Sequence, residues 1–413
     1  MFKRPIVIGL SPNLGVFDVL TAFVVLLSPW KWFGVHAIGR VEEWFRAYFN
    51  VSYASSFNSG RSALYAVLKN LGIGAGDEVL LQAFTCVAVP NSVLWTGARP
   101  VYVDIDDSLN FDPIDAARKI SPKTKVLIVQ HTFGNPADMD AVMSFAKKHN
   151  LLVIEDCAHA LGARFKEKKL GLFGDAAIFS FGRDKVVSSV FGGIAITRQK
   201  ELGEKLNVFQ KSLSQSPLWW VIQQVLHPII TSISLPLYHI GIGKLILLIS
   251  QKLHLLSFPV YKEEKLGQKP SFFPTQYSNV LAELLIPQLS RLAMFTQKRN
   301  EMVTIYKNEL RAKSDTMPQI RDGAVLMRFP VFVSNPGEVL GKARKKGMVL
   351  GNWYRSCIDP KGVDNEKVFF DRETTPRAVF ASEHIVNLPT YPYMNSDDAK
   401  SIVSFISNFS DSV

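Results

Sequence analysis

Leu151-Leu152-Val153-Ile154-Glu155-Asp156 is a short apolar run that ends in two carboxylates. Four consecutive apolar residues are typical of a strand that is buried on both faces of a sheet. Similar runs recur between residues 57 and 197, and helix-like stretches at 62–70, 88–95 and 139–149 separate them. The other runs lie at residues 79–81, 100–104, 125–129, 176–179 and 193–196.

Apolar strands that alternate with helices predict an α/β domain with a mostly parallel sheet, sandwiched by helices. Right-handed crossovers bring the carboxyl ends of the strands to one edge, where we expect the ligand. A helix-like stretch follows at 279–310. The rest, with a strand at 325–332 and helices at 336–346 and 396–409, predicts a smaller C-terminal α+β domain.

Composition excludes several classes of protein. The chain has 413 residues, 47% of them hydrophobic and 20% charged, which excludes a disordered chain and indicates two or three units. Three distant cysteines without CxxC spacing argue against a disulfide framework or a zinc site, and favour a reducing compartment. The net charge of +11 is scattered among acids without a nucleic-acid motif, so we expect no nucleic-acid partner. We also expect no metal, since the cysteine spacing does not suit one.

Four parts are expected along the chain: an N-terminal arm with helices (1–50), a large α/β domain (51–211), an apolar insertion (212–265), and a long helix with the small domain (266–413). Within the arm, residues 16–27 are strongly apolar, but Asp18 interrupts them and no small-residue cleavage site follows. We therefore interpret 16–27 as an amphipathic or buried helix and not as a signal peptide.

The insertion contains an uncharged run of 32 residues, 212–243. Pro217, Pro228 and Pro236 interrupt it, so one straight membrane-spanning helix is not expected. Two hypotheses remain open. The run folds onto the protein's own surface or a dimer interface, or residues 212–251 make a peripheral membrane contact, with Trp219 and Trp220 at the headgroup level.

Four features lie where a ligand is expected. Asn58-Ser59-Gly60-Arg61-Ser62 opens the helix 62–70, and free N–H groups at such a turn suit a phosphate, although an ordinary helix cap has the same sequence. Asp156 ends a strand and either faces a ligand or caps the next helix. His159 is either a ligand contact or a structural side chain. Lys185 follows the strand 176–179, where poor solvation would make its amine nucleophilic.

Together, a phosphate turn, a strand-end Asp and a Lys 29 residues later indicate a pyridoxal phosphate site. The phosphate needs N–H groups and a hydroxyl, the pyridine nitrogen needs a carboxylate, and the aldehyde needs an amine for a Schiff base. The same amine can later move a proton.

The sequence resembles the DegT/DnrJ/StrS family of pyridoxal phosphate-dependent sugar aminotransferases, which have the aspartate-aminotransferase fold (fold type I). The motifs that carry the resemblance are Gly72-Ile73-Gly74-Ala75-Gly76-Asp77-Glu78-Val79, Pro100-Val101-Tyr102-Val103-Asp104-Ile105-Asp106, Pro136-Ala137-Asp138-Met139-Asp140, Glu155-Asp156-Cys157-Ala158-His159-Ala160 and Phe173-Gly174-Asp175.

The resemblance implies a role for each matching residue. Lys185 is the Schiff-base lysine, Asp156 the partner of the pyridinium nitrogen, and His159 a contact of the ring hydroxyl. The phosphate cradle comprises Ser180 with Gly60, Arg61 and Ser62. Cys86 stands where the family has a ring-stacking aromatic residue.

Two motifs depart from the family pattern. The Gly-Glu-Gly-Gly after the lysine reads Val190-Phe191-Gly192-Gly193, and the Asn-x-Arg that reaches into the neighbouring subunit reads Gln276-Tyr277-Ser278.

The resemblance further implies an aminotransferase that moves an amino group from an amino acid, glutamate above all, to a nucleotide- or lipid-linked keto-sugar in surface polysaccharide or glycoconjugate biosynthesis. Relatives that dehydrate sugars carry His at the lysine position, so Lys185 argues against that branch. A homodimer is expected, in the cytoplasm or on the inner face of the plasma membrane. The alternative is a non-catalytic relative that binds the cofactor or a sugar for regulation or scaffolding.

Overall fold

A seven-stranded sheet lies at the centre of the computed structural model, which describes residues 6–238, 240–311 and 316–409. Its strand order is β2-β11-β10-β7-β6-β3-β5. β11 is antiparallel to β10 and β2, and the other pairs are parallel, which confirms the prediction of a mostly parallel sheet. The strands are β2 (Tyr53–Phe57), β3 (Glu78–Gln82), β5 (Arg99–Val103), β6 (Thr124–Gln130), β7 (Leu152–Asp156), β10 (Ala176–Ser180) and β11 (Gly193–Thr197).

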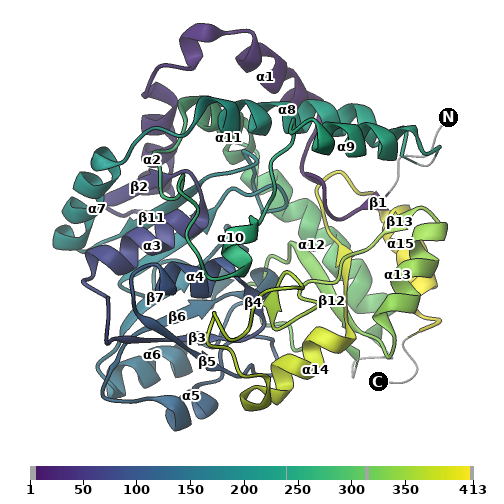
Figure 1. The fold of residues 1–413 in the computed structure, drawn as a ribbon. Coiled ribbons are helices and arrows are strands. Elements are labelled where there is room, and N and C mark those ends of the chain that lie inside the picture. The colour runs from purple at the N-terminus through teal and green to yellow at the C-terminus, as the bar shows by residue number, and fades with distance from the viewer. Residues whose placement is uncertain (1–5, 239, 312–315, 410–413) are drawn as a thin grey trace.

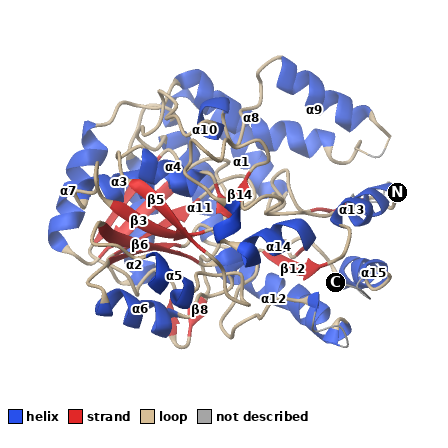
Figure 2. Cartoon of the chain, turned by 60° about the horizontal axis from the view of Figure 1, so that its bottom comes forward, coloured by secondary structure: helices blue, strands red, loops and turns tan. Residues whose placement is uncertain are grey.

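Helices cover both faces of the sheet (Figure 2). Because side chains alternate along a strand, Leu80 and Leu127 join a core with α2 (His36–Phe49) and α6 (Met139–Lys148). Their neighbours Val79 and Val126 join a second core with α3 (Gly60–Asn70) and α4 (Ala88–Leu94). This two-sided burial explains the unbroken apolar runs.

Strand β2 was not expected from the sequence, because Ser55 and Ser56 interrupt its apolar pattern. Both serines are buried and find polar partners there. The Ser55 hydroxyl donates to Asn207 Oδ1 at 2.8 Å, and the Ser56 hydroxyl donates to Glu42 Oε1 at 2.7 Å. Tertiary hydrogen bonds thus stabilise a strand whose sequence lacks the apolar pattern of a buried strand.

The C-terminal residues build a third core around an antiparallel pair, β12 (Arg328–Phe332) with β15 (Ile385–Pro389). The expected strand at 325–332 is therefore shorter than predicted, because Val325 and Met327 donate their N–H groups to the loop at 133–134. The elements around the pair are α12 (Leu292–Glu309), α13 (Pro336–Lys345), α14 (Pro376–His384), α15 (Ser396–Ile406) and the short parallel pair β1 (Ile6–Val7) with β13 (Met348–Val349).

The prediction of one helix over 279–310 is wrong, since the structure has α11 (Asn279–Leu289) and then α12. The helix breaks at Arg291, which turns back on α11. Its Nε donates to Pro287 O at 2.8 Å, and its guanidinium forms an ion pair with Asp18 at 2.5 Å. A long-range ion pair therefore sets the break.

The apolar segments form helices at one end of the molecule. Figure 1 shows α1 (Val16–Leu26), α8 (Leu218–Ser234) and α9 (Ile242–Lys252) together at the top, far from α5 (Pro113–Lys119) and α6. α8 continues through Pro228, so this proline does not interrupt it. The sequence predicts an amphipathic or buried helix over 16–27. A helix forms there with one side buried, but it is not fully buried, because large apolar residues of α1 are exposed. Within the described ranges, no helix is both long and apolar enough to cross a membrane.

The remaining elements join these parts. They are η1 (Pro29–Lys31), β4 (Thr85–Cys86), η2 (Thr132–Gly134), β8 (Arg164–Phe165), β9 (Lys168–Lys169), α7 (Lys200–Ser212), α10 (Lys262–Lys265), β14 (Ile358–Asp359) and η4 (Arg372–Thr374).

Candidate active site

A cavity of about 660 Å³ lies at the carboxyl ends of β7 and β10. Parallel pairing of these strands sets Ile178 beside Asp156, so residues that leave the two strands meet at one edge. The cavity collects seven of the eight residues singled out in the sequence: Gly60, Arg61, Cys86, Asp156, His159, Ser180 and Lys185. The eighth, Ser62, does not line it.

Ser62 belongs to the framework of the turn that opens α3. Its N–H donates to Ser59 Oγ at 3.2 Å, and its hydroxyl donates to Asn58 Oδ1 at 2.7 Å. The side chain is fully buried. Ser62 therefore shapes the turn, while Ser59 and Gly60 face the cavity.

The turn packs so closely that only glycine fits. A Cβ at Gly60 would lie 2.8 Å from Ser180 Cβ, and one at Gly193 would lie 2.4 Å from Gly60 N. The first turn of α3 and the Ser180 hydroxyl thus share a narrow cradle at a helix N-terminus. Such a cradle suits a phosphate group, because backbone N–H groups and the positive end of the helix dipole converge there.

Two arginines flank this cradle in different states. Arg61 forms an ion pair with the buried Glu264 and donates to Pro259 O at 2.8 Å, so its guanidinium is already engaged. Arg183 donates through Nη2 to the carbonyl and hydroxyl of Ser257, each at 2.5 Å. Its buried Nε has no hydrogen-bond partner among the described residues, and burial lowers the pKa of Arg183 to about 10.

The cavity therefore fits an anionic ligand at this end. Two features suit a phosphate monoester: the glycine cradle, which a Cβ would fill, and the Nε of the buried Arg183 guanidinium, which has no hydrogen-bond partner among the described residues. Sequence reasoning missed Arg183, although it lies only two residues before Lys185.

Lys185 and His159 form the central pair. Lys185 Nζ lies 2.8 Å from His159 Nε2, and His159 Nδ1 accepts the N–H of Phe133 at 3.2 Å. Burial, helped by Lys185 and Arg328, lowers the pKa of His159 well below its ordinary value, so the ring is neutral. Because Nδ1 accepts, the single ring proton lies on Nε2 and points at Lys185.

A proton on Nε2 requires a lone pair on Lys185, which only the neutral amine has. Burial also lowers the pKa of Lys185, although Asp184 counteracts this effect. The hydrogen-bond pattern and the desolvation therefore agree. Both favour the neutral, nucleophilic form of the Lys185 amine over the charged form.

Asp156 and Asp184 are carboxylates with different surroundings. Burial raises the pKa of Asp156, against the opposing effects of the Ala158 N–H and of Lys185. Burial would raise the pKa of Asp184 too, but Arg328 and Lys185 together lower it. Asp184 and Arg328 form an ion pair, and the Arg328 guanidinium lies 3.5 Å from the centre of the Trp353 ring.

Cys86 stands at the cavity wall, and burial raises the pKa of its thiol. The aromatic residues of the site come instead from distant parts of the chain. The Phe133 ring stacks on His159 with centroids 6.0 Å apart and on Tyr354 with centroids 5.9 Å apart. Tyr354 and Trp353 line the cavity, and the sequence around them carries no motif that could have indicated this.

Glu155, the neighbour of Asp156, points away from the cavity into the fold. Its carboxylate accepts N–H groups from Gly171, Phe173 and Gly174 at 2.6 to 2.9 Å and lies 3.2 Å from His131 Nε2. The alternation of the strand thus gives one carboxylate to the cavity and the other to a structural loop.

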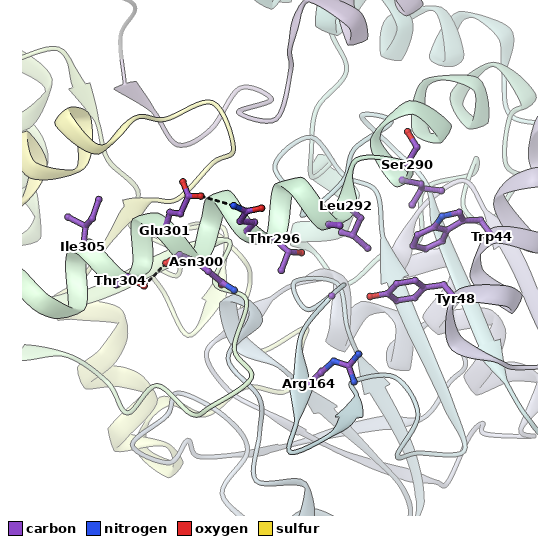
Figure 3. Close-up of a pocket in the computed structure, with 14 residues that line it drawn as sticks. Trp44, Tyr48, Arg164, Ser290, Leu292, Thr296, Asn300, Glu301, Thr304 and Ile305 are labelled. Carbon is purple, nitrogen blue, oxygen red and sulfur yellow. Dashed lines mark hydrogen bonds between the residues drawn. The ribbon is translucent and has the colours of Figure 1, made fainter.

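A second hollow of about 1030 Å³ lies along α12, between Trp44, Tyr48 and Arg164 (Figure 3). It is lined mainly by the exposed face of α12, where Gln297 Nε2 donates to Glu301 Oε1 at 3.1 Å. None of the residues singled out in the sequence lines this hollow. The chemistry therefore belongs to the first cavity.

Comparisons with known proteins point to one family. A sequence model described as the DegT/DnrJ/EryC1/StrS aminotransferase family matches residues 25–219 and 251–407. A spore coat polysaccharide biosynthesis protein, SpsC, from Bacillus subtilis is 34% identical over 209 residues, which are 50% of this chain and 54% of the relative. GDP-perosamine synthase from Caulobacter vibrioides is 39% identical over 181 residues, 43% of this chain and 49% of the relative. The chain spans about half the length of the curated relatives it matches.

Solved structures share the fold across the whole chain. A putative sugar aminotransferase, Spr1654, from Streptococcus pneumoniae superimposes with a TM-score of 0.75 at 20% identity, covering 100% of this chain and 97% of the other. DesV from S. venezuelae gives a TM-score of 0.72 at 24% identity, covering 96% and 95%. The fold is fold type I, and the family implies pyridoxal phosphate as cofactor. From the match over both segments and the shared fold, the chain belongs to the DegT/DnrJ/EryC1/StrS aminotransferase family.

Proposed function

We propose that this protein is a pyridoxal phosphate-dependent aminotransferase that transfers an amino group from an amino acid, with glutamate the first candidate, to a keto-sugar. The observation that carries this proposal is the buried Lys185 amine, which contacts His159 in one cavity with Asp156 and a phosphate cradle. The names of its relatives support a sugar substrate in polysaccharide biosynthesis.

Each residue has a distinct task in this proposal. The Gly60 turn, Ser180 and Arg183 would hold the phosphate, and Asp156 would be the partner of the ring nitrogen. Lys185 would supply the amine for the aldehyde. When bound, the cofactor supplies an electron sink next to the substrate's amino-bearing carbon.

The protein's own groups then control protons. Lys185 would take a proton from one carbon and return it to another, because burial lowers the pKa of its amine and His159 lies beside it. His159 holds its own proton on Nε2 and so keeps the lysine lone pair oriented. Asp184 and Arg328 neutralise each other, and this leaves Asp156 as the carboxylate for the ring nitrogen.

Two features of the whole protein are part of the proposal. We expect a homodimer, and a peripheral contact with the inner face of the plasma membrane through residues 212–251. We also propose residues 51–211 as the cofactor-binding domain, with 266–413 as the long helices and the small domain.

The test is a screen of nucleotide-linked and lipid-linked keto-sugars for glutamate-dependent amination by the purified protein. Amination that depends on Lys185 supports the proposal. The alternative is a binding or scaffold protein. A protein that shows the visible absorbance of bound cofactor, but aminates none of the keto-sugars with any amino donor, would favour that alternative.

A further inference from the structure

Helix α9 has its apolar side turned outward. Only Gly243 and Ser250 are buried, whereas Leu245 is 54% exposed and Leu248 is 50% exposed. A surface helix of a water-soluble protein shows the opposite arrangement, with the apolar side facing the core. The exposed side of α9 therefore suits a less polar environment than water.

Helix α1 has the same inverted arrangement. Its buried residues are Asp18, Ala22 and Val25, while Phe17 is 74% exposed. The charged residue is the inward one: Asp18 accepts the Gly15 N–H at 2.8 Å and pairs with Arg291.

Helix α8 lies against both and supplies a polar interior. Gln224, His227, Thr231 and Ser234 are all buried on it. His227 Nδ1 lies 3.1 Å from the Ser11 hydroxyl, and Gln224 Oε1 accepts the Ser257 hydroxyl at 2.7 Å. Polar residues therefore lie beside the apolar ones, such as Val221 and Val225, that α8 buries.

These helices form one continuous surface, which we call the apolar platform (α1, η1, α8 and α9). α1 packs on α8, and α8 packs on α9, although α1 and α8 lie about 200 residues apart in the chain (Figure 1). The family match leaves out residues 1–24 and 220–250, which contain most of the platform. The sequence pattern shared by the family therefore does not extend over most of the platform, although solved structures superimpose over the whole chain.

The charges of the platform favour an anionic partner. Asp18 is the only carboxylate in α1, α8 and α9, and it is buried. The exposed cations are Lys244 and Lys252, and exposed tryptophans (Trp30 and Trp219) suit the depth of lipid headgroups. An anionic bilayer attracts these lysines.

We propose that the apolar platform docks this protein on an anionic membrane surface. α1 and α9 have 11 residues each, about 16 Å of helix, so they lie in the interface and do not cross a hydrocarbon core of about 30 Å. The chain that leaves α9 lines the cavity with Phe258, Pro259 and Val260. Docking therefore holds a wall of the candidate active site next to the membrane.

Flotation with lipid vesicles tests this inference. The full-length protein is mixed at low salt with phosphatidylcholine vesicles that contain either no phosphatidylglycerol or about 30 mol% of it. The platform variant is L245D/L248D, and the matched control is I114D/V208D, which alters still more exposed apolar residues on α5 and α7. We expect the wild-type protein and the control to float with anionic vesicles, and the platform variant to bind at least roughly tenfold more weakly.

Three further readings make the outcome unambiguous. Visible absorbance of bound cofactor in the wild type, L245D/L248D and I114D/V208D shows that the catalytic fold is intact. K185A should float like the wild type, which separates docking from the proposed catalysis. A wild-type protein that stays unbound at low salt overturns the inference. So does sedimentation in which L245D/L248D splits a dimer that does not float, because the platform is then an interface between copies.

Discussion

The carboxyl edge of the sheet and the apolar platform bury their residues by opposite rules. At the sheet, apolar strands such as β7 are buried on both faces, and polar groups such as Asp156 emerge only where a strand ends. At the platform, polar groups such as Thr231 are buried, and leucines such as Leu248 face outward. The sheet follows the rules for folding in water, whereas the exposed leucines of the platform are the feature from which we propose docking on a membrane.

The largest expected effect tests the chemistry of the sheet edge. Replacing Lys185 with Ala removes the nucleophilic amine and the proton carrier together. We expect loss of the visible absorbance of bound cofactor and a fall in transamination of roughly 10²–10⁴-fold or more. Absorption spectra and initial rates measure both. Full activity in K185A would show that the amine of another residue does the chemistry.

The second effect concerns Asp156. In D156N the side chain keeps its shape but loses the charge that faces the ring nitrogen. Cofactor should still bind, while kcat falls roughly 10²-fold, or about 3 kcal/mol. E155Q is the comparison, since Glu155 holds a structural loop and should change unfolding more than kcat. Unchanged kcat in D156N would assign the ring nitrogen to another residue.

The third effect is a pH dependence. Burial lowers the pKa of Lys185 below its ordinary value of 10.5, so the neutral fraction rises with pH and reaches half below pH 10.5. Capture of pyridoxal phosphate by the cofactor-free protein should therefore speed up about tenfold per pH unit below that midpoint. Stopped-flow absorbance measures it, with an exposed lysine analogue in solution as reference. A midpoint at or above 10.5 would contradict a neutral amine at Lys185.

The fourth effect tests the packing inside the platform. A Cβ at Gly243 would lie 2.0 Å from Ser234 O, whereas one at Gly39 in α2 would meet nothing within 4 Å. G243A should destabilise the fold by about 1–3 kcal/mol, and G39A should stabilise it by up to about 1 kcal/mol. Urea unfolding gives both values. Equal shifts of the same sign would disprove the close α8–α9 contact.

The smallest effect is also the sharpest contrast. Leu248 is exposed, so L248K in solution should change the free energy of unfolding by less than about 0.5 kcal/mol. L127A, in the sheet, should cost about 2–5 kcal/mol because Leu127 is fully buried. Thermal unfolding without lipid compares them. A large loss in L248K would mean that Leu248 packs against protein.

Much of the fold could be predicted because strands buried on both faces leave unbroken apolar runs. The exception, β2, shows the limit: its serines are buried only because Asn207 and Glu42 accept their hydroxyl groups. Likewise, no local pattern separates α11 from α12, since the break depends on Arg291 meeting Asp18, 273 residues away. The expected homodimer and domain limits stay predictions.

The candidate site divides in the same way. Its strand-end residues, Asp156, Ser180 and Lys185, were predictable because parallel strands bring their carboxyl ends to one edge. Ser62 was placed in the cradle because the sequence shows a turn but not which hydroxyl points inward. Tyr354 and Arg328 line the cavity although they lie beyond residue 320, and no local sequence pattern predicts contacts between residues so far apart in the chain.

The sequence by itself therefore determined that the sheet is mostly parallel, that a ligand is expected at the carboxyl ends of its strands, and which cofactor chemistry the residues there suit. These follow from local patterns and from strand direction. Only the tertiary structure decided the protonation of the Lys185–His159 pair, since that depends on a Phe133 N–H and on burial. It also decided that α1 joins α8 and α9 with their apolar sides outward. A sequence shows how apolar a segment is, but which side faces the solvent is fixed by what packs against it.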